Sequence, residues 1–102
     1  MASKPKKLPP MHPGEVLREE FMEPYGLSAY KVASLCRVPR TRIERIAKEE
    51  IGISLDTALR LAKLFGATPE FWINLQINYE LEQTAHEIQE ELDQIDPHQL
   101  AA

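Results

Sequence analysis

The sequence contains a single cysteine, Cys36, among its 102 residues. One cysteine excludes an intrachain disulfide and is typical of proteins in a reducing compartment. Long apolar runs are also missing, since none approaches the roughly 18 residues that a membrane-spanning helix requires. No apolar stretch of the secretory kind follows the N-terminal MASKPKKLPP. We therefore expect a cytoplasmic protein that has no membrane partner.

Residues that could carry catalysis or bind a metal are scarce. His12, His86 and His98 lie far apart, and they form no cluster with metal-ligand spacing. The four glycines are isolated from one another, so the sequence has no glycine-rich loop for phosphate groups. Cys36 has no evident base beside it and is interpreted as a small packing residue. We expect neither an enzyme nor a protein that needs a metal or another cofactor.

The positive and negative charges of the chain lie in different places. There are 12 Lys and Arg residues and 16 Asp and Glu residues, which give a formal net charge of -4. Residues 1–79 hold all 12 bases and nine of the acids, a balance of 12 − 9 = +3, whereas the other seven acids follow Tyr79 without any Lys or Arg. The stretch VPRTRIERIAKEE, residues 38–50, alone contains three arginines and one lysine. The two parts of the chain are therefore expected to meet different partners.

Helical periodicity runs through most of the chain, and no stretch alternates in the way of a β-strand. Residues 1–13 contain four prolines and three lysines, so they are expected to form a flexible basic arm. Five helices are predicted, over residues 14–23, 28–36, 39–48, 54–65 and 69–94, and their ends follow from capping residues and helix breakers. The fold is therefore expected to be all-α, with a helix-turn-helix domain over residues 14–79 and an acidic C-terminal extension and tail over residues 80–102.

The apolar positions of these helices predict the core. Apolar residues three or four positions apart lie on one face of a helix, and that face packs inward. Phe71 and Trp72 are assigned to the core as well, because aromatic residues at helical spacing are more often core than binding site. The predicted core consists of Val16, Leu17, Phe21, Val32, Ala33, Leu35, Ile43, Ile46, Leu55, Ala58, Leu59, Ala62, Phe65, Phe71 and Trp72.

Two of the predicted helices, over residues 28–36 and 39–48, are short and joined by a tight turn, which is the pattern of a helix-turn-helix. Ala33 is small where the first helix must let the second approach closely, and Val38 is apolar just before the second helix. Arg37 occupies a turn position that usually holds glycine, and a non-glycine residue with positive φ costs about 1 kcal/mol there. The spacing and the packing positions together favour DNA binding over a merely solvated basic helix.

In a helix-turn-helix, the first residues of the second helix reach base edges in the major groove. Arginine reads guanine there through two hydrogen bonds, and threonine can touch a thymine methyl group. Side chains at the flanks and the free N–H groups at the start of the first helix contact phosphates instead. We predict that Arg40, Thr41, Glu44 and Arg45 face the bases, and that Ser28, Lys31, Arg42 and Lys48 face the phosphates.

The stretch MHPGEVLREEFMEPYGLSAYKVASLCRVPRTRIERI, followed by GISLDTALRLAKLFGATPEFWINLQINYELE, resembles the HigA antitoxin family, also called virulence-associated protein I. This family belongs to the larger group of phage-repressor-like helix-turn-helix proteins. The resemblance covers about residues 11–82, and HPGE and TPEFWINLQ are its most specific blocks. Two positions depart from the family: Arg37 in the turn, and Lys48-Glu49 where many relatives have Asn-Gly. The second departure would let the third helix continue for another turn.

The resemblance implies a five-helix, repressor-like bundle that dimerises and binds a palindromic operator in its own promoter. It also implies a partner, a HigB-like toxin, which is a small basic ribonuclease resembling RelE that cleaves mRNA at the ribosome. The DNA-reading positions of the family fall on Arg40, Thr41 and Arg45, with Glu44 between them. Such a protein is bacterial and cytoplasmic, and associates with the nucleoid when bound to DNA. A solitary phage-type repressor, or a protein-interaction module without specific DNA binding, remains an alternative.

Apolar residues recur in the acidic extension in steps of 4, 3, 4 and 3, at Leu81, Ala85, Ile88, Leu92 and Ile95. This spacing is the stripe of a helix that packs on one other helix, and we call these five residues the seam. The seam packs on the same chain, extends frayed beyond the core, forms part of a dimer interface, or contacts a basic partner whose association the flanking acids would speed. The three lysines of the N-terminal arm either reach along DNA or keep the chain soluble; they are Lys4, Lys6 and Lys7.

Overall fold

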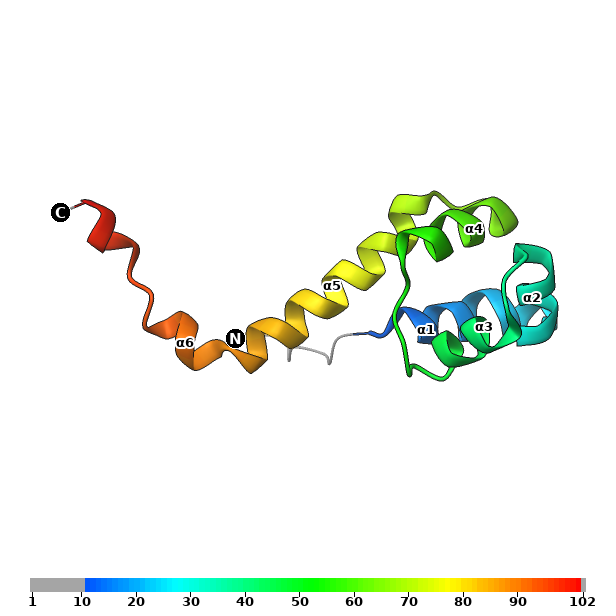
Figure 1. Cartoon of the computed structure of the whole chain (residues 1–102), viewed down its shortest axis with the longest axis horizontal. Coiled ribbons are helices and arrows are strands. Elements are labelled where there is room, and N and C mark those ends of the chain that lie inside the picture. The colour runs from blue at the N-terminus through cyan, green and yellow to red at the C-terminus, as the bar shows by residue number, and fades with distance from the viewer. Residues whose placement is uncertain (1–10, 102) are drawn as a thin grey trace, which may run out of the picture.

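The computed structural model describes residues 11–101, and the regular structure in this range is entirely helical (Figure 1). The prediction of an all-α fold is thereby confirmed for these residues. The predicted arm lies outside the described residues up to residue 10. The elements are α1 (Pro13–Val16), η1 (Leu17–Met22, a π-helix), η2 (Glu23–Tyr25, a 3-10 helix), α2 (Ala29–Cys36), α3 (Arg40–Ala47), α4 (Leu55–Phe65), α5 (Pro69–Glu87), α6 (Gln89–Asp93) and η3 (Pro97–Ala101, a 3-10 helix).

The HPGE block begins the first helix and fixes it to the rest of the fold. His12 is the N-cap of α1, and its Nδ1 accepts a hydrogen bond from the Gly14 N–H at 2.9 Å. Pro13 occupies the first helical position, where its missing N–H leaves nothing unpaired. Because His12 and Pro13 are both buried, the predicted arm extends too far toward the C-terminus. Gly14 lies against the Ile46 carbonyl of α3, in a space that a Cβ atom would fill.

The predicted single helix over residues 14–23 is instead three consecutive segments, α1, η1 and η2. Pro24 lies within η2, and Gly26 ends it in a left-handed conformation, with φ of 63°. The Leu27 N–H donates to the Met22 carbonyl at 2.9 Å, which closes this end with a Schellman motif. The breakers were therefore identified correctly, whereas the π-helical segment before them was not predicted.

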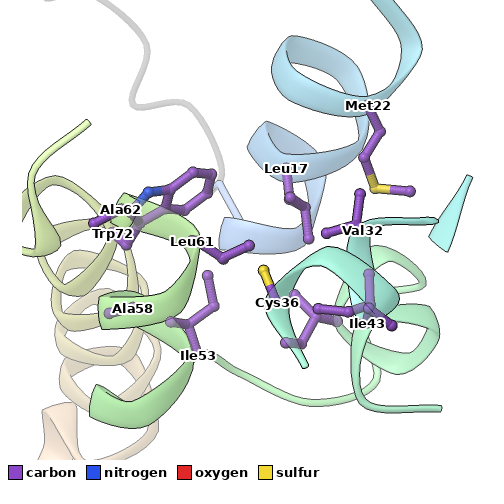
Figure 2. Close-up of a cluster of buried hydrophobic side chains, with 12 residues drawn as sticks. Leu17, Met22, Val32, Cys36, Ile43, Ile53, Ala58, Leu61, Ala62 and Trp72 are labelled. Atoms are coloured by element: carbon purple, nitrogen blue, oxygen red, sulfur yellow. The ribbon is translucent and has the colours of Figure 1, made fainter. Parts of the chain in front are cut away.

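The core lies between η1, the two short helices α2 and α3, and the pair α4 and α5 (Figure 2). Trp72 is the residue of α5 that is fully buried, with no exposed surface. Leu61 of α4 and Leu17 of η1 are also fully buried. These three large side chains join the N-terminal helices to α4 and α5, and the helix-turn-helix therefore rests on one continuous core.

Four residues of the predicted core are exposed instead: Leu35 is 48% exposed, Leu55 71%, Leu59 60% and Phe71 39%. The buried face of α4 contains Leu61 and lies to one side of the predicted Leu55–Leu59 stripe. Leu35 lies beside the buried face of α2 and not on it, because residues 32, 33 and 36 form that face. The predictions for these four positions are wrong.

The TPEFWINLQ block anchors the first half of α5 through its first and last residues, Thr68 and Gln76. Thr68 is the predicted N-cap, and its Oγ1 accepts a hydrogen bond from the Phe71 N–H at 3.1 Å. One turn beyond Trp72, Gln76 accepts a hydrogen bond from the Ile53 N–H at 2.7 Å. Gly52 leaves room for the Gln76 side chain, which a Cβ atom at this position would meet. The block therefore ties α5 to the loop that follows α3.

The fifth helix is shorter than predicted. It ends at Glu87, because Ile88 leaves the helical conformation with φ of -110° and ψ of 20°. The short α6 follows, and this end of the chain points away from the body (Figure 1). The radius of gyration is 17.7 Å, compared with about 13 Å for a compact chain of this length. Among the described helices, none has the length and apolar character needed to cross a membrane.

Candidate nucleic-acid interface

The turn between α2 and α3 spans residues 37–39 and is held by two backbone hydrogen bonds. The Arg37 N–H donates to the Ser34 carbonyl at 3.2 Å, and the Val38 N–H donates to the Ala33 carbonyl at 3.0 Å. This pair forms a Schellman motif, in which the position of Arg37 usually belongs to glycine. Arg37 has φ of 62° and ψ of 45°, so the turn keeps the left-handed conformation at this position although the residue is not glycine.

Arg60 of α4 closes the C-terminal end of α2. One of its terminal nitrogens donates to the Cys36 carbonyl at 2.8 Å, and its Nε donates to Asp56 Oδ1 at 2.7 Å. The same oxygen of Asp56 accepts a hydrogen bond from Arg42 of α3, also at 2.7 Å. These bonds, first from Arg60 and then from Arg42, lower the pKa of Asp56 below its ordinary value. One carboxylate therefore links α3 to α4 beside the turn.

Arg18 of η1 closes the C-terminal end of α3 in the same manner. Its guanidinium donates to the Ala47 carbonyl at 2.5 Å and to the Glu49 carboxylate at 3.2 Å. Glu49 has a positive φ of 64°, and the Glu50 N–H donates to the Arg45 carbonyl at 2.8 Å. This second Schellman motif ends α3 at Ala47, and the expectation that α3 continues for another turn is therefore wrong.

The orientation of α3 follows from its two isoleucines. Ile43 is fully buried and Ile46 is 1% exposed, so the opposite side of the helix faces solvent. Arg40 and Arg45 lie on that side, where their side chains are 60% and 57% exposed. Thr41 is exposed as well. Three of the four predicted base-reading residues thus lie on an accessible face of the second helix of the motif.

Both exposed arginines of α3 are near a carboxylate. Arg40 Nε lies 3.4 Å from Glu44 one turn later, and Arg45 Nε lies 3.5 Å from Glu50 beyond the end of the helix. Exposed ion pairs of this kind contribute only about 0–1 kcal/mol. The arginines can therefore leave these partners for a nucleic acid at little cost. Glu44, the fourth predicted base-reading residue, is half-buried on the same helix.

The predicted phosphate-contacting residues differ in whether their side chains are exposed or already bonded to another residue. Ser28 caps α2 by accepting a hydrogen bond from the Lys31 N–H at 3.1 Å, which leaves its hydroxyl proton available to a phosphate. Lys31 and Lys48 are exposed. Arg42 is half-buried and bonded to Asp56, so a phosphate contact would have to compete with that carboxylate. Ser28, Lys31 and Lys48 therefore fit the predicted role more directly than Arg42 does.

Sequence reasoning missed the residues that position this face, namely Arg18, Asp56 and Arg60. Asp56 and Arg60 are four residues apart on one helix, a spacing that indicates an ion pair and that the sequence does display. The bonds from Arg18 and Arg60 to the ends of α3 and α2 join residues 29 and 24 positions apart. No local pattern reveals such contacts.

The seam lies outside the helix-turn-helix and is not covered by the described part of the chain. Leu81 is 63% exposed, and Ile95 is 68% exposed. Ile88 and Leu92 are 40% and 39% exposed, and Ala85 is exposed too. Packing of the seam against its own chain does not occur among the described residues, whereas an extension beyond the core agrees with the exposure of the seam.

Comparison with known proteins matches this geometry to a family. The helix-turn-helix family model matches residues 19–73. Virulence-associated protein I of Dichelobacter nodosus is 47% identical over 75 residues, which cover 74% of this chain and 69% of that protein. Antitoxin HigA-1 of Vibrio cholerae is 33% identical over 88 residues, which cover 86% of this chain and 83% of that protein.

A solved structure has the same fold with nucleic acid present. The Pseudomonas aeruginosa antitoxin HigA, determined with the higBA promoter, has a TM-score of 0.84 and 35% sequence identity to this chain. The match covers 86% of this chain and 97% of that chain. It therefore includes the helix-turn-helix and most of the remaining described helices.

Proposed function

Because this chain belongs to the helix-turn-helix family and, within it, to the HigA and virulence-associated protein I antitoxins, we propose that it binds an operator in its own promoter and represses its own operon. The observation that carries this proposal is the accessible face of α3, where Arg40 and Arg45 project from a helix whose two ends are fixed by neighbouring helices. Double-stranded operator DNA is the partner of this face.

The geometry supports a direct reading of bases by α3. In this class of motif the second helix lies in the major groove and its N-terminal residues contact base edges. Arg40 and Arg45 would each leave a nearby carboxylate to hydrogen bond guanine, and Thr41 would contact a neighbouring base or phosphate. Glu44 would accept a hydrogen bond from cytosine, or orient Arg40 beside it.

Phosphate contacts would set the position of α3 in the groove. Ser28 and Lys31 at the start of α2 combine a hydroxyl, an ammonium group and the free N–H groups of a helix N-terminus. Lys48 would contact the backbone beyond the other end of α3, and Arg42 would do so only by leaving Asp56. These contacts carry no sequence information and give the binding its dependence on salt.

We propose that the DNA-binding form is a homodimer, because a two-fold symmetric dimer matches a palindromic operator. Leu55 and Leu59 on α4, with Ile77 and Leu81 on α5, are exposed apolar residues on two helices that pack together. We assign the dimer interface to these four residues. The later part of the seam, from Ala85 onward, is flanked by acids that would repel the same acids of a second copy.

The antitoxin relatives support a second activity, neutralisation of a HigB-like toxin that cleaves mRNA. Such a toxin is small and basic, and this chain offers acidic surfaces away from α3. The family consists of DNA-binding regulators and antitoxins, not of a known class of enzyme, and our proposal gives the chain no catalytic step. We place this activity in the cytoplasm.

Titration of the protein against its own upstream DNA tests the operator proposal. We expect tight binding to this DNA, with two protomers per site, and much weaker binding to a scrambled sequence of the same composition. Specific affinity should fall steeply between two salt concentrations, because several phosphates release counterions on binding. Equal binding to the scrambled DNA would contradict the proposal and favour a protein-interaction module. A small basic reading frame beside the gene would separate an antitoxin from a solitary repressor.

A further inference from the structure

Two hollows flank Phe21 on the side of the molecule formed by η1, η2 and the junction of α4 with α5. One has a volume of about 350 Å³ and lies between Phe21, Tyr25 and the C-terminal end of α4. The other has a volume of about 360 Å³ and lies between Phe21 and the start of α5. We call this region the aromatic surface, and its lining residues are Met11, Val16, Glu20, Phe21, Tyr25, Leu27, Leu64, Phe65, Phe71 and Leu75.

Phe21 is the fixed centre of the aromatic surface. Its ring lies 4.8 Å from that of Trp72, 5.0 Å from that of Phe65 and 6.0 Å from that of Phe71, measured between centroids. The π-helical segment η1, which places Phe21 there, is a rare conformation that recurs at functional sites. The hollows are therefore bounded by a cluster of rings that contact one another.

Several apolar side chains around the hollows remain in contact with solvent. Tyr25 is 70% exposed, Met11 is 52% exposed and Phe71 is 39% exposed. Exposed aromatic and methionine side chains beside hollows are enriched in protein interfaces. A tyrosine such as Tyr25 can supply much of the binding energy of an interface when a partner covers it.

The edge of the aromatic surface is acidic. Glu20 lines one hollow, Glu23 precedes Tyr25 in η2, and Glu70 lies in the first turn of α5. All three are exposed, and none of them forms an ion pair with another residue in the range 11–101. The nearby Arg18 is directed to the end of α3 and to Glu19. The surface thus combines apolar hollows with carboxylates that form no ion pair within residues 11–101.

We propose that the aromatic surface is where this chain docks a basic protein partner, the HigB-like toxin of the proposed function, on which this inference rests. A second copy of the chain fits less well, because a two-fold contact would bring Glu20 and Glu23 of both copies together. A basic partner would place lysine or arginine side chains against these carboxylates and apolar groups in the hollows.

The aromatic surface is separate from the DNA-reading face. The two hollows take no lining residue from α2 or α3. The end of α3 is contacted by Arg18, whereas Phe21 faces α4 and α5. One protomer can therefore hold DNA and the basic partner at once, and a complex of all three is expected.

Charge reversal on matched pairs of exposed acids tests the assignment. The first variant carries Glu20→Lys and Glu23→Lys at the aromatic surface, and the control carries Glu90→Lys and Glu91→Lys on α6. Both change the net charge by the same amount. A third variant, Tyr25→Ala, removes an exposed ring without changing charge. The partner used is the purified product of a small basic reading frame beside the gene, the candidate HigB-like ribonuclease. Its binding is measured by surface plasmon resonance, with operator affinity and thermal unfolding measured in parallel.

We expect the Glu20→Lys/Glu23→Lys variant to raise the dissociation constant for the ribonuclease about tenfold or more, largely through slower association. Tyr25→Ala should raise it through faster dissociation, and the α6 control should change it little. Operator affinity of the aromatic-surface variants should not fall below that of the control. Loss of binding in the control alone would overturn the inference and assign the partner to the seam.

The outcomes also separate this inference from the proposed function. If the unaltered chain does not bind the ribonuclease, toxin neutralisation is wrong and the docking surface is wrong with it. If the unaltered chain binds and the aromatic-surface variants bind equally well, only the docking surface is wrong. The last test asks whether DNA and the ribonuclease bind at the same time. The ribonuclease is added to a preformed complex of protein and operator, and displacement of the DNA would contradict the separation of the DNA-reading face from the aromatic surface.

Discussion

Arg37 shows how one residue can strain the motif that it helps to form. It occupies the glycine position of a Schellman motif with φ of 62°. We expect Arg37→Gly to raise the free energy of unfolding by about 1 kcal/mol, because glycine adopts this conformation without the steric cost of a Cβ atom. Urea-induced unfolding measures the change. Arg37→Ala retains the Cβ atom and should give no such gain; an equal gain would mean that the arginine side chain itself is unfavourable.

The base-reading assignment makes a prediction about Arg40 and Arg45. Either substitution by alanine should cost about 1–3 kcal/mol of operator affinity and relax the preference for one base pair. Lys48→Ala should weaken operator and scrambled DNA alike and reduce the salt slope by about 1. Fluorescence anisotropy with both DNAs distinguishes the two kinds of residue. If Arg40→Ala and Arg45→Ala footprint the operator normally, α3 does not read the bases.

His12 makes the start of the first helix sensitive to pH. Its pKa lies below 6.5, chiefly because burial disfavours the charged form; Glu49 acts in the opposite direction, and Arg18 adds to the lowering. The unfolded chain therefore binds the proton more readily, so His12 stabilises the fold fully above pH 6.5 and progressively less as the pH falls through its folded pKa. We expect the melting temperature to fall between pH 7 and pH 5.

His12→Asn supplies the control for this pH dependence. Asparagine is a good N-cap that does not titrate, so it removes the proton-binding group and preserves the cap. The variant should lose less of its melting temperature between the two pH values than the unaltered chain does. An identical loss in both proteins would assign the pH dependence to other groups.

At the scale of helices, the N-capping residues were predicted most accurately from the sequence. Ser28, Ser54 and Thr68 each cap a helix as predicted, through hydrogen bonds that lie within three residues of the chain. The buried face of α4 was predicted less accurately, because Leu55 and Leu59 are as apolar as Leu61 although only Leu61 is buried. Which stripe of α4 packs inward depends on α5 and on the N-terminal helices, and therefore on contacts that local spacing does not encode.

The packing of α1 against α3 depends on a single glycine. A Cβ atom on Gly14 would collide with the Ile46 carbonyl, which belongs to backbone and cannot rotate away. We expect Gly14→Ala to destabilise the fold by about 1–3 kcal/mol, as overpacking does, and to weaken operator binding by shifting the end of α3. Glu15→Ala, at the next position, should change both quantities much less. Thermal unfolding and anisotropy check the pair, and a normal melting temperature for Gly14→Ala would mean that α1 can move aside freely.

At the scale of the molecule, three surfaces can be distinguished: the basic face of α3, the acidic extension after Tyr79 and the aromatic surface. Basic side chains gather on α3 and the start of α2, whereas seven acids and no Lys or Arg follow Tyr79. The sequence predicted this division and the exposed face of α3 that we propose reads DNA. It did not predict the aromatic surface, because Phe21, Tyr25 and Phe71 come together only through the packing of η1 against α4 and α5. Residue types alone placed Phe21 and Phe71 in the core and gave Tyr25 no role.

The assembly proposed for DNA binding can be tested with one buried charge. Leu59 is 60% exposed on α4 and is expected to lie in the dimer interface. Leu59→Glu would place an unpaired carboxylate there, so sedimentation should show a monomer at concentrations where the unaltered chain is a dimer. Operator affinity should fall with it, because a monomer contacts one half-site only. Leu92→Glu introduces the same charge in the seam and should leave the dimer intact; a monomeric Leu92→Glu variant would instead assign the interface to the acidic extension.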